Sequence, residues 1–142
     1  MNPDYIPAKL QRQVRERAGD RCEYCRLSQA GQEATFHVDH VRPRREGGTT
    51  VLANLALACV SCSLRKGART AGLDPQTGTT VDIFDPRTEA WGEHFLVHED
   101  FAIRGRTPAG RATVELLRIN RPLALEIRRE EALQGRFPRD TE

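Results

Sequence analysis

The chain has 142 residues, of which 38% are hydrophobic, 6% aromatic and 30% charged, and this composition is typical of one soluble globular domain. The net charge of +2 is uneven, because residues 1–70 carry +5 and residues 71–142 carry −3. There is neither an apolar run of about 18 residues nor an apolar N-terminal stretch, so we expect no membrane span, no signal peptide and a cytoplasmic location.

The first half of the chain predicts a helix, a strand, a loop, a second strand and a second helix. Residues 7–18 predict an amphipathic helix between a first-turn proline and a glycine that stops it. Residues 35–41 are strand-like, and residues 42–50 contain a proline and two glycines that indicate a loop. The apolar residues 51–58 predict the second strand, and a helix is expected after Cys59.

The second half of the chain predicts a loop, a hairpin and two helices. Asp-Pro and Thr-Gly pairs in residues 70–92 indicate a long ordered surface loop. Residues 94–104 predict two short strands around a turn. Thr107 is placed as the N-cap of a helix, and a last charged helix is expected over residues 122–133. Residues 135–142 are expected to form a frayed tail.

Four cysteines form two Cys-x2-Cys pairs, Cys22 with Cys25 and Cys59 with Cys62. This spacing is typical of two knuckles that present four thiolates to one tetrahedral zinc ion. Two disulfides, free core thiols or a redox role are the alternatives, but nothing indicates secretion and neither pair opens a helix in a recognisable βαβ unit. An ion with four sulfur ligands has no open position, so this zinc would be structural and any catalysis needs a second centre.

The segment between and around the two cysteine pairs carries a series of short motifs. In chain order these are His37-Val-Asp39-His40, Gly47-Gly48 and Asn54-Leu55. The second cysteine pair, Cys59-x2-Cys62, follows, and after it come Ser63 and Lys66. Their order and spacing resemble those of the HNH endonuclease family over about residues 20–68. Residues 8–120 are also similar to a family of small bacterial HNH proteins.

The resemblance implies an α+β fold built on a ββα-metal core, with the four-cysteine zinc knuckle embedded in it. The core would cover about residues 20–68 within a single nuclease domain of residues 1–142. A helix would precede this core. A C-terminal extension over about residues 69–134 would add a β-hairpin and two helices.

The resemblance also implies roles for individual residues in a metal-dependent endonuclease. His40 would be the general base, since an imidazole titrates near neutrality. Asp39 would bind Mg²⁺ or another catalytic divalent ion, and Asn54 would hold the loop and orient His40. The family's third position is usually His or Asn and ligates this ion. Here it is Ser63, whose hydroxyl is a weaker ligand, so that the ion would bind weakly or not at all.

The substrate implied is double-stranded DNA, gripped by a basic surface beside the site. The residues of this surface are Arg42, Arg44, Arg45, Arg65, Lys66 and Arg69. An inactive scaffold that binds nucleic acid through the basic half is the alternative, and a zinc-stabilised adaptor that never meets nucleic acid is a third hypothesis. The choice of DNA over RNA, the sequence preference and the oligomeric state are not determined by these motifs.

The positions of the remaining histidines leave further alternatives open. Neighbouring residues of a regular strand point to opposite faces, so Asp39 and His40 can share a site only at a strand end or irregularity. His37 is either a partner that supports this site or a polar residue on the outer face of the strand. His94 and His98 either reach the metal or belong to an exposed hairpin.

Overall fold

Helix α1 (Ala8–Ala18) opens the computed structural model, which describes residues 5–137 of the chain. The helix follows Pro7 and ends at Gly19, whose left-handed backbone (φ 64°) allows its N–H to cap the carbonyl of Glu16. Two arginines of the helix attach it to the backbone of later segments. Arg15 donates to the carbonyl of Phe36, and Arg17 donates to the carbonyls of Leu52 and Leu55.

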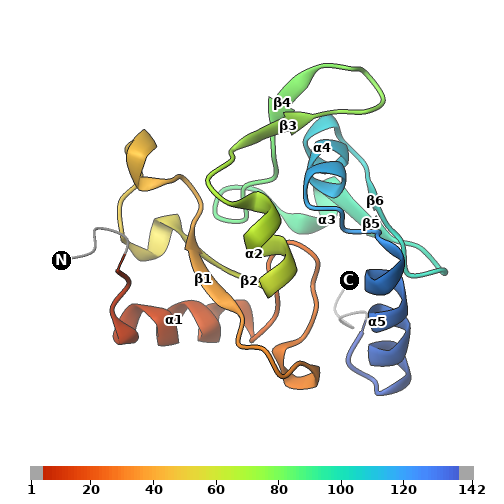
Figure 1. The fold of residues 1–142 in the computed structure, drawn as a ribbon, viewed down its shortest axis with the longest axis horizontal. Coiled ribbons are helices and arrows are strands. Elements are labelled where there is room, and N and C mark those ends of the chain that lie inside the picture. Colours follow the sequence, from red (N-terminus) through yellow and green to blue (C-terminus); the bar gives the residue numbers. More distant parts are fainter. Residues whose placement is uncertain (1–4, 138–142) are drawn as a thin grey trace.

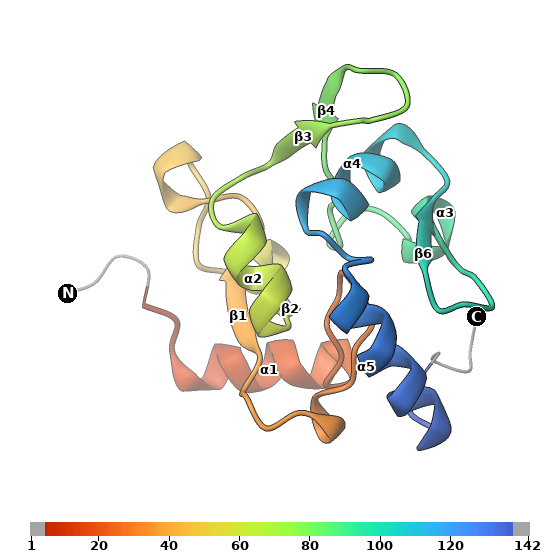
Figure 2. The same ribbon diagram turned by 45° about the vertical axis from the view of Figure 1, so that its right-hand side comes forward.

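The centre of the fold is the strand–strand–helix unit that the sequence predicts. Strand β1 (His37–His40) pairs with β2 (Leu55–Ala58) in antiparallel register, His37 opposite Ala58 and His40 opposite Leu55. Helix α2 (Val60–Lys66) follows β2 directly. In Figures 1 and 2, α1 passes beneath the two strands and α2 lies beside β1. The predicted α+β class and the ββα order are confirmed.

Both strands are shorter than predicted, and in the second a tight turn replaces the first residues. The 3₁₀ turn Leu52–Asn54 occupies the start of the second predicted strand, where the Asn54 N–H donates to the carbonyl of Val51. Two further 3₁₀ turns are Gln29–Gly31, before β1, and Arg44–Glu46, within the predicted loop. The pairing of β1 with β2 ends at His40, where the chain enters the loop.

The predicted long loop over residues 70–92 is wrong, because it folds into a hairpin and the start of a helix. Strand β3 (Ala71–Leu73) pairs with β4 (Thr80–Asp82), and helix α3 (Trp91–His94) begins before the loop was expected to end. The Asp74-Pro and Thr77-Gly signals are the turn of this hairpin. Asp74 is fully buried there and receives two hydrogen bonds from the Arg111 guanidinium.

The rest of the extension follows the predicted order more closely. Strand β5 (Phe95–Val97) pairs with β6 (Ile103–Gly105), and α4 (Pro108–Leu116) is capped by Thr107, whose Oγ1 accepts from the Gly110 N–H. Helix α5 (Pro122–Leu133) ends the regular structure. The extension thus has two hairpins rather than one. Phe137 is buried, so the predicted fraying does not apply to residues 135–137, and residues 138–142 lie outside the described chain.

One hydrophobic cluster contains side chains from the ββα unit and from the extension, among them Val14, Tyr24, Leu57, Phe84, Phe95 and Leu117. The Trp91 indole N–H donates to the carbonyl of Tyr24 at 2.9 Å and joins the extension to the first knuckle. Of the helices in residues 5–137, none combines the length and apolar character that a membrane crossing requires.

Candidate metal centre and active site

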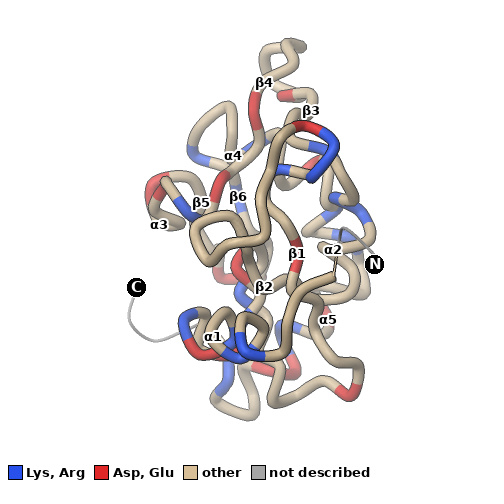
Figure 3. Tube along the Cα trace, turned by 90° about the vertical axis from the view of Figure 1, so that its left-hand side faces the viewer, with Lys and Arg blue, Asp and Glu red and all other residues tan. Residues whose placement is uncertain are grey.

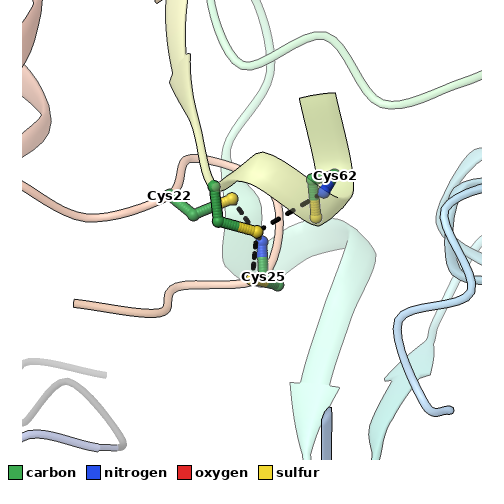
Figure 4. A group of neighbouring side chains, drawn as sticks. Cys22, Cys25 and Cys62 are labelled. Carbon is green, nitrogen blue, oxygen red and sulfur yellow. Dashed lines mark hydrogen bonds between the residues drawn. The ribbon is translucent and has the colours of Figure 1, made fainter. Parts of the chain in front are cut away.

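The four cysteines meet in one buried cluster, although they come from two distant segments. Cys22 and Cys25 lie on the turn after α1, and Cys62 lies in the first turn of α2 (Figure 4). Cys59 is the N-cap of this helix. Their four Sγ atoms all lie within 4.8 Å of one another, and the Cys25 and Cys59 sulfurs are 3.8 Å apart. The structure has no disulfide among them.

This cluster fits a tetrahedral zinc ion. Zinc–sulfur bonds of about 2.3 Å place two ligands of a tetrahedron about 3.8 Å apart, which is the Cys25–Cys59 separation. In each knuckle a backbone N–H, of Cys25 or Cys62, donates to the first sulfur of its own pair. Burial raises the pKa of the Cys22 thiol, whereas hydrogen bonds from the other three thiols, led by Cys22, hold the pKa of Cys59 far below its usual range. Buried negative charge of this kind is stabilised by a cation.

The second candidate centre is a surface hollow at the end of β1, which we call the Asp39 hollow. Its lining residues are Asp39, His40, Pro43, Arg44, Ser63, Gly67 and Ala68, around a volume of about 240 Å³. Asp39 and His40 are neighbours on the chain, yet both line it, because His40 is the last paired residue of β1 and the backbone leaves the strand there. The hollow therefore brings Asp39, His40 and Ser63 to one surface site.

His40 and the loop after it are held by side chains from the segment before β2. The His40 Nε2 lies 2.8 Å from the Thr50 Oγ1. The Asn54 side chain accepts from the Arg42 N–H and donates to the carbonyls of Arg42 and Thr49, so it ties the two ends of the loop together. Asn54 thus contacts the loop backbone rather than the imidazole. Thr50 was not predicted, since nothing in the sequence distinguishes it from Thr49.

Gly48 is needed where this loop returns to the strand. A Cβ atom at this position would collide with the carbonyl of Arg42 and would lie 2.9 Å from the Asn54 Nδ2. Because Gly48 has no side chain, the backbone here can lie close to Arg42, and the Asn54 side chain can bond to both ends of the loop. Gly47 has positive φ (91°) and turns the chain before it.

Ser63 lines the Asp39 hollow, and its hydroxyl is engaged by a histidine. The Ser63 Oγ lies 2.8 Å from Nδ1 of His37, an exposed residue two positions before Asp39 on β1. Residues two apart on a strand share a face, so His37 and Asp39 both lie on the side that faces α2. His37 is thus a partner of Ser63. Apart from the cysteines, residues 5–137 contain no group of three His, Cys, Asp or Glu side chains close enough to hold an ion.

The predicted basic surface is only partly exposed. Arg42, Arg44, Arg45 and Arg69 are exposed, and the loop after β1 also carries an acidic residue among its arginines (Figure 3). Arg65 is half-buried, and its Nη1 lies 3.3 Å from the Ser61 Oγ. For Lys66 the prediction of a surface phosphate contact is wrong, because the side chain is 2% exposed and its ammonium donates to backbone carbonyls.

His94 and His98 both lie in the extension. His94 belongs to α3 rather than to the predicted hairpin, with its Nδ1 2.6 Å from the Thr107 Oγ1 and its Nε2 3.7 Å from a Glu89 carboxylate oxygen. His98 lies in the turn between β5 and β6, where its backbone pairs with Ala102. Neither lines the Asp39 hollow.

Comparison with protein families identifies the ββα segment. The HNH endonuclease family model matches residues 22–69. Comparisons with curated proteins and with solved structures found no match. Residues 22–69 therefore match the HNH endonuclease family, and this span contains all four cysteines, β1, β2, α2 and the Asp39 hollow. The extension lies outside the matched span.

Proposed function

We propose that this protein is a metal-dependent endonuclease that hydrolyses phosphodiester bonds in DNA, with the four cysteines binding a structural zinc ion. The observation that carries the proposal is that Asp39 and His40 line one hollow at the end of β1, inside the HNH span. A carboxylate can bind a hard divalent ion and an imidazole can accept a proton, and the two together can support metal-dependent hydrolysis of a phosphodiester.

His40 is the proposed general base. Its Nε2 lies 2.8 Å from the Thr50 Oγ1, and the neutral imidazole takes the proton from the attacking water. Thr50 then fixes the orientation of the ring. Asn54 acts through the loop, because its three backbone hydrogen bonds keep the segment that carries Thr50 against the end of β1.

Asp39 is the proposed protein ligand of a catalytic divalent ion such as Mg²⁺. One carboxylate is a sufficient protein anchor for Mg²⁺, which keeps several waters and uses substrate phosphate oxygens as further ligands. When bound, the ion would stabilise negative charge on the phosphate and on the leaving oxygen. The Ser63 hydroxyl lines the same hollow, and its bond to His37 fixes its position.

Double-stranded DNA is the proposed substrate. Arg44 lines the hollow itself, and the exposed Arg42, Arg45 and Arg69 lie on the adjoining segments, where their guanidinium groups can grip phosphates. Contacts of this kind are independent of sequence, so the chain should bind many sequences and lose affinity steeply as salt is raised.

Incubation of the zinc-loaded protein with supercoiled plasmid and linear duplex tests the proposal. We expect cleavage in Mg²⁺ or Mn²⁺ and none after the loosely bound divalent ion is removed, because Asp39 alone anchors that ion. Zinc content must be measured in every sample, so that loss of activity in EDTA is not caused by stripping the cysteine site. Equal cleavage with and without added divalent ions would contradict the metal-dependent mechanism.

An inactive scaffold that binds DNA without cleaving it is the second candidate. The observation in its favour is that the position at which the family carries a metal ligand is here a serine bonded to His37. Salt-dependent DNA binding without cleavage in any divalent ion would establish this alternative. No DNA binding at all would favour the adaptor.

Substitutions of Ser63 distinguish the two candidates. If Ser63 faces the ion, Ser63→Asn and Ser63→His should lower the metal concentration required for half-maximal cleavage, because an amide or imidazole is the better ligand. Ser63→Ala should change it little. The measurement is a metal titration of plasmid cleavage, with zinc content as the control. Asn and His variants that titrate like the wild type would show that Ser63 does not face the ion, whereas cleavage by these variants alone would make the natural protein a scaffold.

A further inference from the structure

Lys66 is the last residue of α2 and one of the two lysines in the chain. Its side chain is only 2% exposed, and its Nζ donates to the carbonyl of Val41 at 3.1 Å and to that of His40 at 3.5 Å. A buried ammonium is costly to desolvate, and an apolar side chain of equal length would be cheaper to bury. That apolar side chain would, however, leave both carbonyl oxygens without this donor.

The two carbonyls lie where the strand ends. His40 is opposite Leu55, the first residue of β2, and the next backbone bond is donated by the Val41 N–H to the carbonyl of Asn54 at 2.8 Å. The Asn54 side chain then holds Arg42. The segment that leaves the strand is therefore bound from two sides, by Asn54 before β2 and by Lys66 at the end of α2. These contacts fix the point at which Asp39 and His40 come to share one hollow.

The charges around Lys66 are consistent with a fixed ammonium. Burial lowers the pKa of Lys66, and the carboxylates of Asp39, Asp85 and Glu46 act in the opposite direction. These carboxylates come from β1, from the extension and from the loop after β1. Lys66 also lines a cavity of about 310 Å³ together with Asn54 and the extension residues Asp82 and Asp85.

We propose that Lys66 is a positioning residue of the nuclease site: its buried ammonium binds the carbonyls of His40 and Val41 and thereby fixes the end of β1 that presents Asp39 and His40. This inference rests on the proposed function only for its effect on catalysis. The structural part, that Lys66 holds the strand end, can be measured without any substrate.

Hydrogen exchange of the Val41 amide, followed by NMR on the zinc-loaded full chain, tests the structural part. In Lys66→Met we expect this amide to exchange about tenfold faster than in the wild type, because the strand end opens more often. Lys9→Met is the matched control, since it removes the exposed lysine of α1, and it should leave Val41 unchanged. Lys66→Gln is the second variant if Lys66→Met does not fold. Its uncharged side chain is one atom shorter and should also leave Val41 less protected. Unchanged exchange in the folded variant would overturn the proposal.

Cleavage kinetics test the catalytic part. Lys66→Met should lower kcat about tenfold or more with little change in KM, since the residue touches no DNA, whereas a phosphate contact such as Arg69 should mainly affect KM. In a His40→Ala background the same Lys66 substitution should cause a smaller loss than in the wild type, because only Asp39 is left for Lys66 to position. A raised KM, or an equal loss in both backgrounds, would overturn the role. A wild-type protein that cleaves nothing would refute the nuclease function, and the Val41 exchange would still decide whether Lys66 holds the strand.

Discussion

Replacing Cys22 or Cys59 by serine should unfold most of the protein and remove its zinc, with about one zinc ion per chain in the wild type. The four sulfurs join the turn after α1 to the start of α2, and both segments contribute to the hydrophobic cluster of the fold. Zinc binding to sites of this type contributes about 10–16 kcal/mol at pH 7, which is comparable to the whole stability of an ordinary domain. Elemental analysis and circular dichroism of the purified variants measure the two effects.

Val60→Ala is the matched control for the cysteine variants. It changes a half-buried residue between Cys59 and Cys62 without removing a ligand, so the zinc should stay bound and any loss of stability should be small. Wild-type protein that is free of zinc and yet folded would show that the cysteines do not form a structural zinc site. A folded Cys59→Ser variant with full zinc content would lead to the same conclusion.

The ββα unit could be predicted from the sequence because its signals are local and chemically specific. The Cys-x2-Cys pairs fix two knuckles by their spacing, and helix α1 is bounded by Pro7 and Gly19. The β3–β4 hairpin could not be recognised in the same way. Its strands have three residues each, and its turn is stabilised by Asp74 bonded to Arg111, which lies 37 residues further along the chain. Long-range contacts of this kind leave no periodic pattern in a sequence.

The types of residue at the candidate site were predictable, but their contacts were not. The motifs indicate Asp39, His40 and Asn54, and the structure brings the first two to one hollow and uses the third to close the loop. A basic residue at position 66 suggests a phosphate contact by its charge alone. Only the fold shows that its side chain turns inward, because burial depends on how α2 packs on the end of β1.

His40→Ala should abolish most cleavage while leaving the fold and the zinc content intact. The imidazole is the group in the Asp39 hollow that can accept a proton from water near neutral pH, and loss of a general base typically costs about 10²–10⁴ in rate. The substitution removes the bond to Thr50 and leaves in place the contacts by which Asn54 and Lys66 hold the strand end. Single-turnover cleavage of a labelled duplex, with DNA affinity measured separately, isolates the effect on chemistry.

Two further measurements make the result specific to proton transfer. Added imidazole should restore part of the activity of His40→Ala, because a small base can occupy the space that the side chain vacates. It should not rescue Asp39→Ala, in which the proposed ion ligand is lost. His98→Ala is the control for a histidine outside the hollow and should cleave like the wild type. If His40→Ala keeps its full rate, His40 is not the base. Since His94 is bonded to Thr107 outside the Asp39 hollow, the search would then move to a second site in the extension.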